Sequence, residues 1–414
     1  MDKNRHDVAI AGAGLTGQLM ALALSQQGFS VALIDPHPAD AQADDPRTTA
    51  LAYASVRLFK RLGLWEALEY RAAAINDILV TNGRPADRFR KGGLSGGRLH
   101  FPSSLLPEHS AGPEGTPLGH IVRNADMLEV FRARLKEDEN VDLITDRIEV
   151  VENKRGNVTL PLGGGRTIEA AFLIACDGKQ SRLRETQGFR TRKWGYDQKA
   201  LAFNLKTEKP HHGVAQEIFY PQGPFAILPL QGNEVSIVWT EKNPGADHYA
   251  RLPEDELIAE VRARVGDHLG QLELSSKPAV FPLTFVYVNN PVEGRIVLAG
   301  DAYHGIHPIA GQGFNLGIKD IAVMADVLHE ARSHGLDVGA PDVLANYVRW
   351  RRFDSAALSF GTDAMTRLFS NDIAPVRWAR GAGLGLVQHF DPARVLFMRQ
   401  AGADTGELPR LMRP

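Results

Sequence analysis

A glycine-rich turn near the N-terminus constrains the fold more than any other feature of the sequence. The apolar run Val8–Ala11 predicts a buried strand, and Leu15–Gln27 has the spacing of a helix. Between them, glycines stand where a strand–turn–helix unit must bend tightly, approach a ligand and pack closely. A second apolar run, Val31–Ile34, ends at an acidic residue whose carboxylate would accept hydrogen bonds from a ribose. The sequence therefore predicts a βαβ dinucleotide site formed by Gly12, Gly14, Leu15, Thr16, Gly17 and Asp35.

A second glycine-rich segment, residues 300–317, again follows an apolar strand and leads into a helix. Asp301 comes directly after the strand, where ligands of open α/β sheets bind. Gly311 and Gly313 would let the backbone approach a planar ligand, and the following helix would direct its positive end toward it. The two glycine-rich segments together predict a nucleotide site built from distant parts of the chain.

Composition and residue types exclude several other functions. The net charge of −2 gives no general attraction to nucleic acid, and 43% hydrophobic with 23% charged residues is typical of a soluble protein. Cys176, the only cysteine, ends an apolar strand and is typical of the core, so no dithiol redox centre can form. His304 and His307 are too few ligands for a metal site, and we expect none. No signal-peptide pattern opens the sequence, and we expect a cytoplasmic protein.

Both glycine-rich segments, together with Asp177–Gly178, resemble those of the class A flavoprotein monooxygenases, of which para-hydroxybenzoate hydroxylase is typical. The segment His307–Gly313 resembles the ubiquinone-biosynthesis hydroxylase branch of that family. The resemblance extends over nearly the whole chain, because further matching segments are Asp45–Leu51, Leu62–Trp65, Gly223–Leu230 and Gly406–Arg413.

The resemblance implies roles for individual residues around noncovalently bound FAD. Asp301 would contact the ribityl and pyrophosphate region, and residues 313–315 would lie along the isoalloxazine ring. Pro308 and Gly311 would lie near the reacting flavin edge, and no side-chain base can be identified. Further residues expected to contact the cofactor are Arg47, Asn124, Asp177, Gly178, Gly313, Phe314 and Asn315. Candidates for the substrate wall are Phe225, Leu228 and Pro229.

The expected fold is α/β, with a doubly wound FAD-binding domain, an inserted antiparallel β-sheet substrate domain and C-terminal helices. Alternation of apolar and polar residues between about 190 and 285 favours the antiparallel sheet. We expect the FAD-binding domain at 1–75, 105–188 and 286–342, the substrate domain at 76–104 and 189–285, and the helical segment at 343–414.

The reaction implied by the resemblance is hydroxylation of an aromatic ring on a polyprenylated ubiquinone precursor. NAD(P)H would reduce the flavin, and O₂ would add to give a C4a-hydroperoxyflavin that transfers oxygen to the ring. Two alternatives remain from the sequence. One is a hydroxylase of a small soluble aromatic acid, and the other is a non-hydroxylating reductase or FAD-binding accessory subunit.

The C-terminal segment mixes basic and apolar residues, a composition that suits a membrane surface or an acidic partner. Against three acidic residues, the segment from Val376 onward carries six arginines: Arg377, Arg380, Arg394, Arg399, Arg410 and Arg413. Contact with the inner membrane, or with a complex of ubiquinone-biosynthesis proteins, would give access to a lipid-soluble substrate. The alternative is a structural cap whose apolar side chains pack inward.

Overall fold

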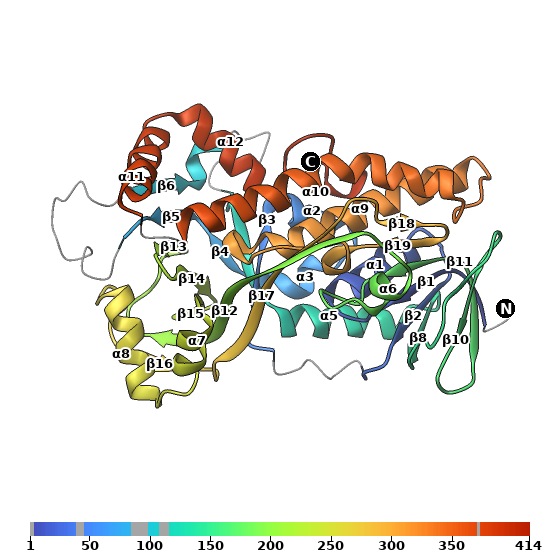
Figure 1. Ribbon diagram of the computed structural model, residues 1–414, viewed down its shortest axis with the longest axis horizontal. Coiled ribbons are helices and arrows are strands. Elements are labelled where there is room, and N and C mark those ends of the chain that lie inside the picture. The colour runs from blue at the N-terminus through green and yellow to red at the C-terminus, as the bar shows by residue number, and fades with distance from the viewer. Residues whose placement is uncertain (1–3, 39–44, 84–97, 107–115, 371–372) are drawn as a thin grey trace.

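The computed structural model describes residues 4–38, 45–83, 98–106, 116–370 and 373–414 (Figure 1). Within these residues the chain forms three β-sheets with helices packed around them, which confirms the predicted α/β fold class. Part of the expected substrate-domain segment, 84–97, lies outside the described residues.

The first sheet carries the predicted βαβ unit. Its order is β18-β19-β11-β1-β2-β8, and the strands from β19 to β8 run parallel. Val8 and Ile10 are fully buried against α1 and α9, while Ala9 and Ala11 pack on the other face, as expected of a sheet covered on both sides. The strands are β1 Arg5–Ala11, β2 Val31–Asp35, β8 Val141–Thr145, β9 Glu152–Asn153, β10 Val158–Pro161, β11 Thr167–Ala175, β18 Val292–Glu293 and β19 Ile296–Leu298.

A nine-stranded sheet of order β20-β17-β12-β15-β14-β13-β5-β6 forms most of the second layer. Strand β5, which comes early in the chain, pairs with β13, and β6 pairs with β5 at the edge of the sheet. The bounds are β5 Asp77–Thr81, β6 Arg98–Pro102, β12 Thr191–Thr207, β13 Val214–Tyr220, β14 Gly223–Leu230, β15 Glu234–Lys242, β16 Leu272–Leu274, β17 Ala279–Val288 and β20 His304–Gly305.

The two faces of this nine-stranded sheet pack against different elements. Phe225, Ile237 and Trp239 share one face with α8, and Figure 1 shows α8 and the C-terminal helices on opposite sides of these strands. The other face, which we expect to look toward the flavin and call the flavin-facing side, carries Ala226, Leu228 and their neighbours across the strands. The helices of this region are α7 Asn243–Tyr249 and α8 Glu254–Val265.

A three-stranded antiparallel sheet, β3-β7-β4, contacts strand β14 of the nine-stranded sheet and helix α9. Its strands are β3 Thr48–Ala52, β4 Ala73–Ile75 and β7 Gly119–Arg123. The helical elements outside the C-terminal segment are α1 Leu15–Ser25, α2 Tyr53–Arg61, α3 Trp65–Leu68, η1 Glu69–Arg71, η3 Ser103–Leu105, α5 Asn124–Lys136, α6 Arg182–Thr186, η4 Gly300–Ala302, η5 Ile309–Gly311 and α9 Gln312–Ser333.

The C-terminal segment is helical, with α10 Pro341–Phe369, α11 Ala374–Gln388, α12 Asp391–Ala401 and η6 Arg410–Met412. Two of its arginines are buried rather than turned outward, contrary to what an amphipathic surface helix would need. Arg380 donates to the carbonyls of Leu368 and Phe369 at the end of α10. Arg394 donates to the carbonyl oxygen of His100 on β6 at 3.0 Å. The side chains of Arg377 and Trp378 lie outside the described ones.

Gln388 completes the contact with β6, because its Oε1 accepts the backbone N–H of His100 at 2.7 Å. Strand β6 is the edge of the nine-stranded sheet, so helices α11 and α12 cover that edge. None of the helices in the described ranges is both long and apolar enough to cross a bilayer.

Candidate flavin and substrate site

The turn between β1 and α1 requires glycine at two positions and leaves space at a third. Gly12 has φ of +101°, and a Cβ there would lie 2.6 Å from the carbonyl oxygen of Cys176. A Cβ at Gly17 would lie 1.8 Å from the carbonyl oxygen of Gly12, so helix and turn pack in direct contact. A Cβ placed at Gly14 would have no atom within 4 Å. The N-terminus of α1 therefore opens onto free space with unbonded N–H groups, an arrangement that accepts a phosphate.

Two carboxylates lie beside this turn, at the C-terminal ends of the two strands that flank β1. Asp35 accepts the backbone N–H of Ala13 at 2.7 Å, which fixes its carboxylate against the glycine-rich turn. Asp177 accepts the backbone N–H of Leu183 with Oδ2 at 3.2 Å, but its buried Oδ1 has no partner in the described part of the chain. Both residues can accept hydrogen bonds from a sugar hydroxyl at this edge of the sheet.

Asp320, a residue that the sequence did not single out, anchors the second glycine-rich segment. Its carboxylate accepts from the backbone N–H of Gly300 at 2.9 Å, from His304 Nε2 at 2.7 Å and from Arg351 Nε at 2.7 Å. Burial alone would raise the pKa of Asp320, but the charges and hydrogen bonds of His304 and Arg351 outweigh it and lower the pKa. This fully buried ion pair fixes the turn that leaves Asp301 exposed at the end of β19.

Asn315 ties the start of α9 to β3. Its Oδ1 accepts from the backbone N–H of Ala52 at 2.9 Å and from Ser55 Oγ at 2.8 Å, while its Nδ2 donates to the carbonyl of Ala50 at 2.7 Å. Gly311 has φ of +63°, and a Cβ there would lie 2.9 Å from that of Ala50. The side-chain amide is fully used within the protein, so Asn315 positions the backbone of this turn. Gly313 and the half-buried Phe314 follow on α9, and Gly313 borders nearly open space.

Charged side chains gather around Asp301. Arg47 forms a bidentate pair with Asp45 at 2.8 and 2.6 Å, and its guanidinium lies 4.6 Å from the ring centre of Phe281. Lys179, directly after Asp177–Gly178, donates to the carbonyl of Ile306 at 3.2 Å. Burial lowers the pKa of Lys179, and the nearby charge of Asp301 opposes that effect. Asp301 also acts electrostatically on Arg47. The structure thus brings together the first and second glycine-rich segments and the segment around Arg47.

Asn124 lies beside the segment around Arg47, and its polar groups form hydrogen bonds within the protein. Its Oδ1 accepts from Thr49 Oγ1 at 2.8 Å, and its backbone N–H donates to the carbonyl of Arg47 at 3.0 Å. The neighbouring Arg123 pairs with Glu234 on β15 at 2.6 Å, which links the three-stranded sheet to the nine-stranded one.

Pro308 begins the turn η5 next to a histidine with unused polar atoms. His307 is fully buried, and neither ring nitrogen has a partner among the described residues. Burial lowers the pKa of His307 to about 3, and Lys179 adds to this effect, so the ring is neutral. Ile309 packs in an apolar cluster with Leu99, Phe219, Phe369 and Leu384. The turn therefore joins the glycine-rich segment to the flavin-facing side of the large sheet.

Strand alternation separates the three candidates for the substrate wall. Phe225 is fully buried on the α8 side, opposite Trp239 in the neighbouring strand, and Pro229 falls on the same side by alternation. Leu228 is half-buried, pairs with Ser236 and packs toward the flavin-binding core. Thr48 donates to Ser236 Oγ at 3.0 Å, so the side that carries Leu228 is the one that contacts the segment around Arg47. Leu228 therefore remains a candidate for the substrate wall, whereas Phe225 and Pro229 lie on the opposite side of the sheet, toward α8.

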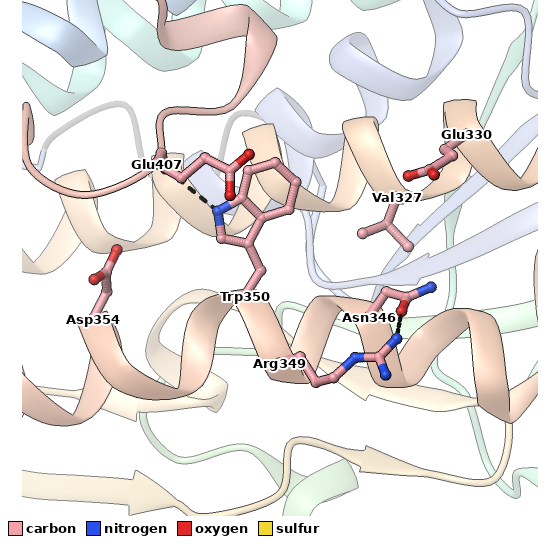
Figure 2. Close-up of a pocket in the computed structure, with 7 residues that line it drawn as sticks. All are labelled: Val327, Glu330, Asn346, Arg349, Trp350, Asp354 and Glu407. Atoms are coloured by element: carbon pink, nitrogen blue, oxygen red, sulfur yellow. Dashed lines mark hydrogen bonds between the residues drawn. The ribbon is translucent and has the colours of Figure 1, made fainter.

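A separate pocket lies on the outer surface between α9, α10 and the C-terminal tail. Figure 2 shows Trp350 and Glu407 on one side of it, where the indole N–H donates to the carbonyl of Glu407 at 3.3 Å. Val327 and Glu330 contribute from α9, at least fourteen residues beyond Gly313. At 1.5 Å per helical residue this is about 20 Å along the helix. This pocket is therefore not part of the flavin site.

Comparison with known proteins identifies the class. The chain matches the family described as "FAD binding domain" over residues 5–353, and it belongs to that family. The openings at Gly14 and Gly313, the unpartnered Asp177 Oδ1 and the exposed Asp301 fit such a cofactor, since they leave donors, acceptors and space along one continuous edge.

Relatives among characterised proteins narrow the class further. The ubiquinone hydroxylase UbiL of Rhodospirillum rubrum is 38% identical over 98% of this chain and 92% of its own length. The 3-demethoxyubiquinol 3-hydroxylase of Escherichia coli is 30% identical over 91% of this chain and 93% of its own. These matches confirm the predicted membership of the flavoprotein monooxygenases and the resemblance to their ubiquinone-biosynthesis branch.

Solved structures share the fold. The p-nitrophenol 4-monooxygenase PnpA of Pseudomonas putida superposes with a TM-score of 0.77 at 18% identity, over 96% of this chain and 99% of its own. HpxO of Klebsiella pneumoniae, solved with FAD, gives 0.75 at 17% identity over the same shares of the two chains.

Proposed function

We propose that this protein is an FAD-dependent monooxygenase that hydroxylates the aromatic ring of a polyprenylated ubiquinone precursor. The observation that carries the proposal is the 38% identity to UbiL of Rhodospirillum rubrum over nearly the full length of both chains. NAD(P)H would supply the electrons and O₂ the oxygen atom. Bound FAD supplies the redox and oxygen-transfer chemistry, and the protein's own residues bind it, orient it and exclude water.

The geometry supports a division of labour among the residues that would hold the cofactor. The α1 N-terminus, with Gly14 open beside it, suits the pyrophosphate, and Asp35 suits a ribose. Asp301 suits the hydroxyls of the ribityl chain, because its carboxylate is exposed and has no described donor. The N-terminus of α9 after Gly311 provides a positive partial charge for the flavin ring. In this proposal the nine-stranded sheet forms the substrate domain and residues 343–414 form the helical cap.

The test uses the purified protein with its cofactor and a short-chain prenylated phenol. We expect a yellow protein that releases FAD on denaturation and places oxygen from isotopically labelled O₂ in the product ring. Asp301→Ala should lower FAD occupancy, whereas Glu330→Gln, in the outer pocket, should leave it unchanged. Product labelled from water, or none in the presence of NAD(P)H, would overturn the proposal.

We further propose that helices α11 and α12 contact a lipid surface, which gives access to a polyprenylated substrate. Four large apolar side chains of this region are between 52% and 75% exposed: Leu386, Phe390, Leu396 and Phe397. Arg394 and Met398 take the inner side of α12, so apolar side chains stand on its outer side. Apolar side chains on the outer side of short helices are typical of shallow insertion at the headgroup boundary.

Flotation with liposomes tests this contact. Because Arg394 is buried and bonded to β6, charge reversal there would disturb the fold. We therefore choose the exposed pair, Leu396→Ser with Phe397→Ser, and use Leu336→Ser, an exposed leucine outside these helices, as the matched control. Wild type and control should float with neutral vesicles, while the double variant should stay in solution with unchanged activity on a short-chain phenol. Equal flotation of all three proteins, or none, would contradict the proposal and leave a structural cap or a protein partner as the role of this segment.

A further inference from the structure

The flavin-facing side of the nine-stranded sheet carries a carboxyl group that the site described above does not use. Glu217 on β13 pairs in register with Ala226 on β14 and with Val80 on β5. Ala226 belongs to the flavin-facing side, since Phe225 and Ile227 on either side of it pack against α8. Strand alternation therefore places the Glu217 side chain on the flavin-facing side.

Contacts across the sheet show what this side covers. Asn204, on the same side of β12, donates to the carbonyl of Pro46 at 3.5 Å, and Ser236 accepts from Thr48 at 3.0 Å. At the other end, Phe219 lies two residues beyond Glu217 and clusters with Ile309, which directly follows Pro308. Glu217 thus lies between two contacts that join this side of the sheet to the proposed flavin edge.

The surroundings of Glu217 are apolar. Its neighbours on the flavin-facing side are Ala215, Phe219, Ala226 and Val80, and no described residue donates a hydrogen bond to its carboxylate. Burial raises its pKa to about 8, and no charge among the described residues opposes this effect. A partly buried, unpartnered carboxyl group costs stability, so its presence here is evidence of a functional role.

Other ionisable groups on the elements packed around this region have partners of their own. Asp77 and His100, on the opposite side of β5 and β6, pair with each other at 2.6 Å. On α10, Asp363 pairs with Arg367 at 2.9 Å. Arg380 on α11 and Arg394 on α12 bond to main-chain carbonyls, as described above. None of these charges contributes to the raised pKa of Glu217.

Resting on the proposed hydroxylase function, we propose that Glu217 is the base that takes the hydroxyl proton of the phenolic substrate. The substrate O–H bond breaks, its electron pair stays on oxygen as phenolate, and the proton forms an O–H bond on the Glu217 carboxylate. The phenolate ring is electron-rich and so prepared for oxygen transfer. A base is most effective when its pKa is near the working pH and not far below that of the phenol, which is about 10 for a tyrosine-like hydroxyl.

The first measurement needs no turnover. Infrared difference spectra of the FAD-loaded protein should show a carboxylic acid C=O band that disappears with a midpoint near pH 8. Adding 2-farnesylphenol should shift this band, and the shift should be absent in Glu217→Gln. Glu241→Gln removes a buried carboxyl from the α8 side of β15 and should leave the phenol-induced shift in place. A shift that persists in Glu217→Gln would overturn the proposal.

The second measurement separates this inference from the proposed function. Glu217→Gln should retain FAD and the wild-type melting temperature. It should hydroxylate 2-farnesylphenol at least about 100-fold more slowly, and its pH–rate profile should lack the limb that wild type shows near pH 8. Glu217→Asp should restore part of the rate together with a pH limb. If wild type hydroxylates the phenol and Glu217→Gln does so equally, only the assignment of Glu217 fails. If wild type forms no product while the infrared shift is present, the proposed function fails instead.

Discussion

The two sides of the nine-stranded sheet differ in the size of the side chains that they carry. On the α8 side, Trp239 is buried, packs against the tilted ring of Tyr249 at 4.2 Å between ring centres, and lies 4.1 Å beneath the guanidinium of Arg264. On the flavin-facing side the same strands carry small side chains, among them Ala202, Ala226 and Ser236. Large side chains on the α8 side hold the shape of the sheet, whereas the small ones lie on the side that contacts the segment around Arg47. Substitutions on the two sides should therefore separate stability from activity.

The largest effect is expected on the α8 side. Trp239→Ala removes a fully packed indole and should lower the free energy of unfolding by about 3–5 kcal/mol. Urea unfolding measures this loss, and hydroxylation per FAD-loaded molecule should change less than threefold at low temperature. A large loss of activity at unchanged stability would show that the two sides do not divide the roles in this way.

An effect of intermediate size is expected from pH. Because the folded-state pKa of Glu217 is raised to about 8, the folded protein binds its proton more tightly than the unfolded chain does. This tighter proton binding adds to the free energy of unfolding. The added free energy is largest below the ordinary glutamate pKa, falls as the pH rises toward 8, and no longer changes above pH 8. The decline should be on the order of 3 kcal/mol or less. Urea midpoints across this range should show it in wild type, and its persistence in Glu217→Gln would assign it to another group.

The smallest effect in free energy is expected on the flavin-facing side. Ala226→Leu adds volume next to Glu217, where the structure has small neighbours. Stability should change by less than about 1 kcal/mol, while KM for a prenylated phenol should rise about tenfold, which corresponds to about 1.4 kcal/mol. Leu252→Ala, on the α8 side, provides the opposite control, with lower stability and unchanged KM. An unchanged KM in Ala226→Leu would mean that the substrate lies elsewhere.

Local patterns predicted the nucleotide-binding elements well. The apolar runs and the glycine spacing predicted β1, α1 and β2, and the second glycine-rich segment leads into helix α9 as expected. These elements depend on short-range hydrophobic patterns and on glycines that end a strand or a helix. The sequence alone was therefore enough to predict them.

Long-range partners and strand sides were not readable from the sequence. Residues 223–230 are apolar throughout, so nothing in them distinguishes the side of Leu228 from that of Phe225. The ion pair of Asp320 with Arg351 joins residues on two helices, and its only local signal is an acid within the apolar run of α9. Glu217 follows Gln216, and two consecutive polar residues give no sign of burial.

The contact between β6 and the C-terminal helices also covers an edge of the nine-stranded sheet. An edge strand presents unpaired N–H and C=O groups to which a strand of another chain can add. Here Gln388 and Arg394 bond to both backbone groups of His100, so a strand of another chain cannot pair at the middle of this edge. A chain shortened before Ile373 would lose both hydrogen bonds. We therefore expect the helical segment to reduce aggregation, independent of any part it has in reaching a substrate.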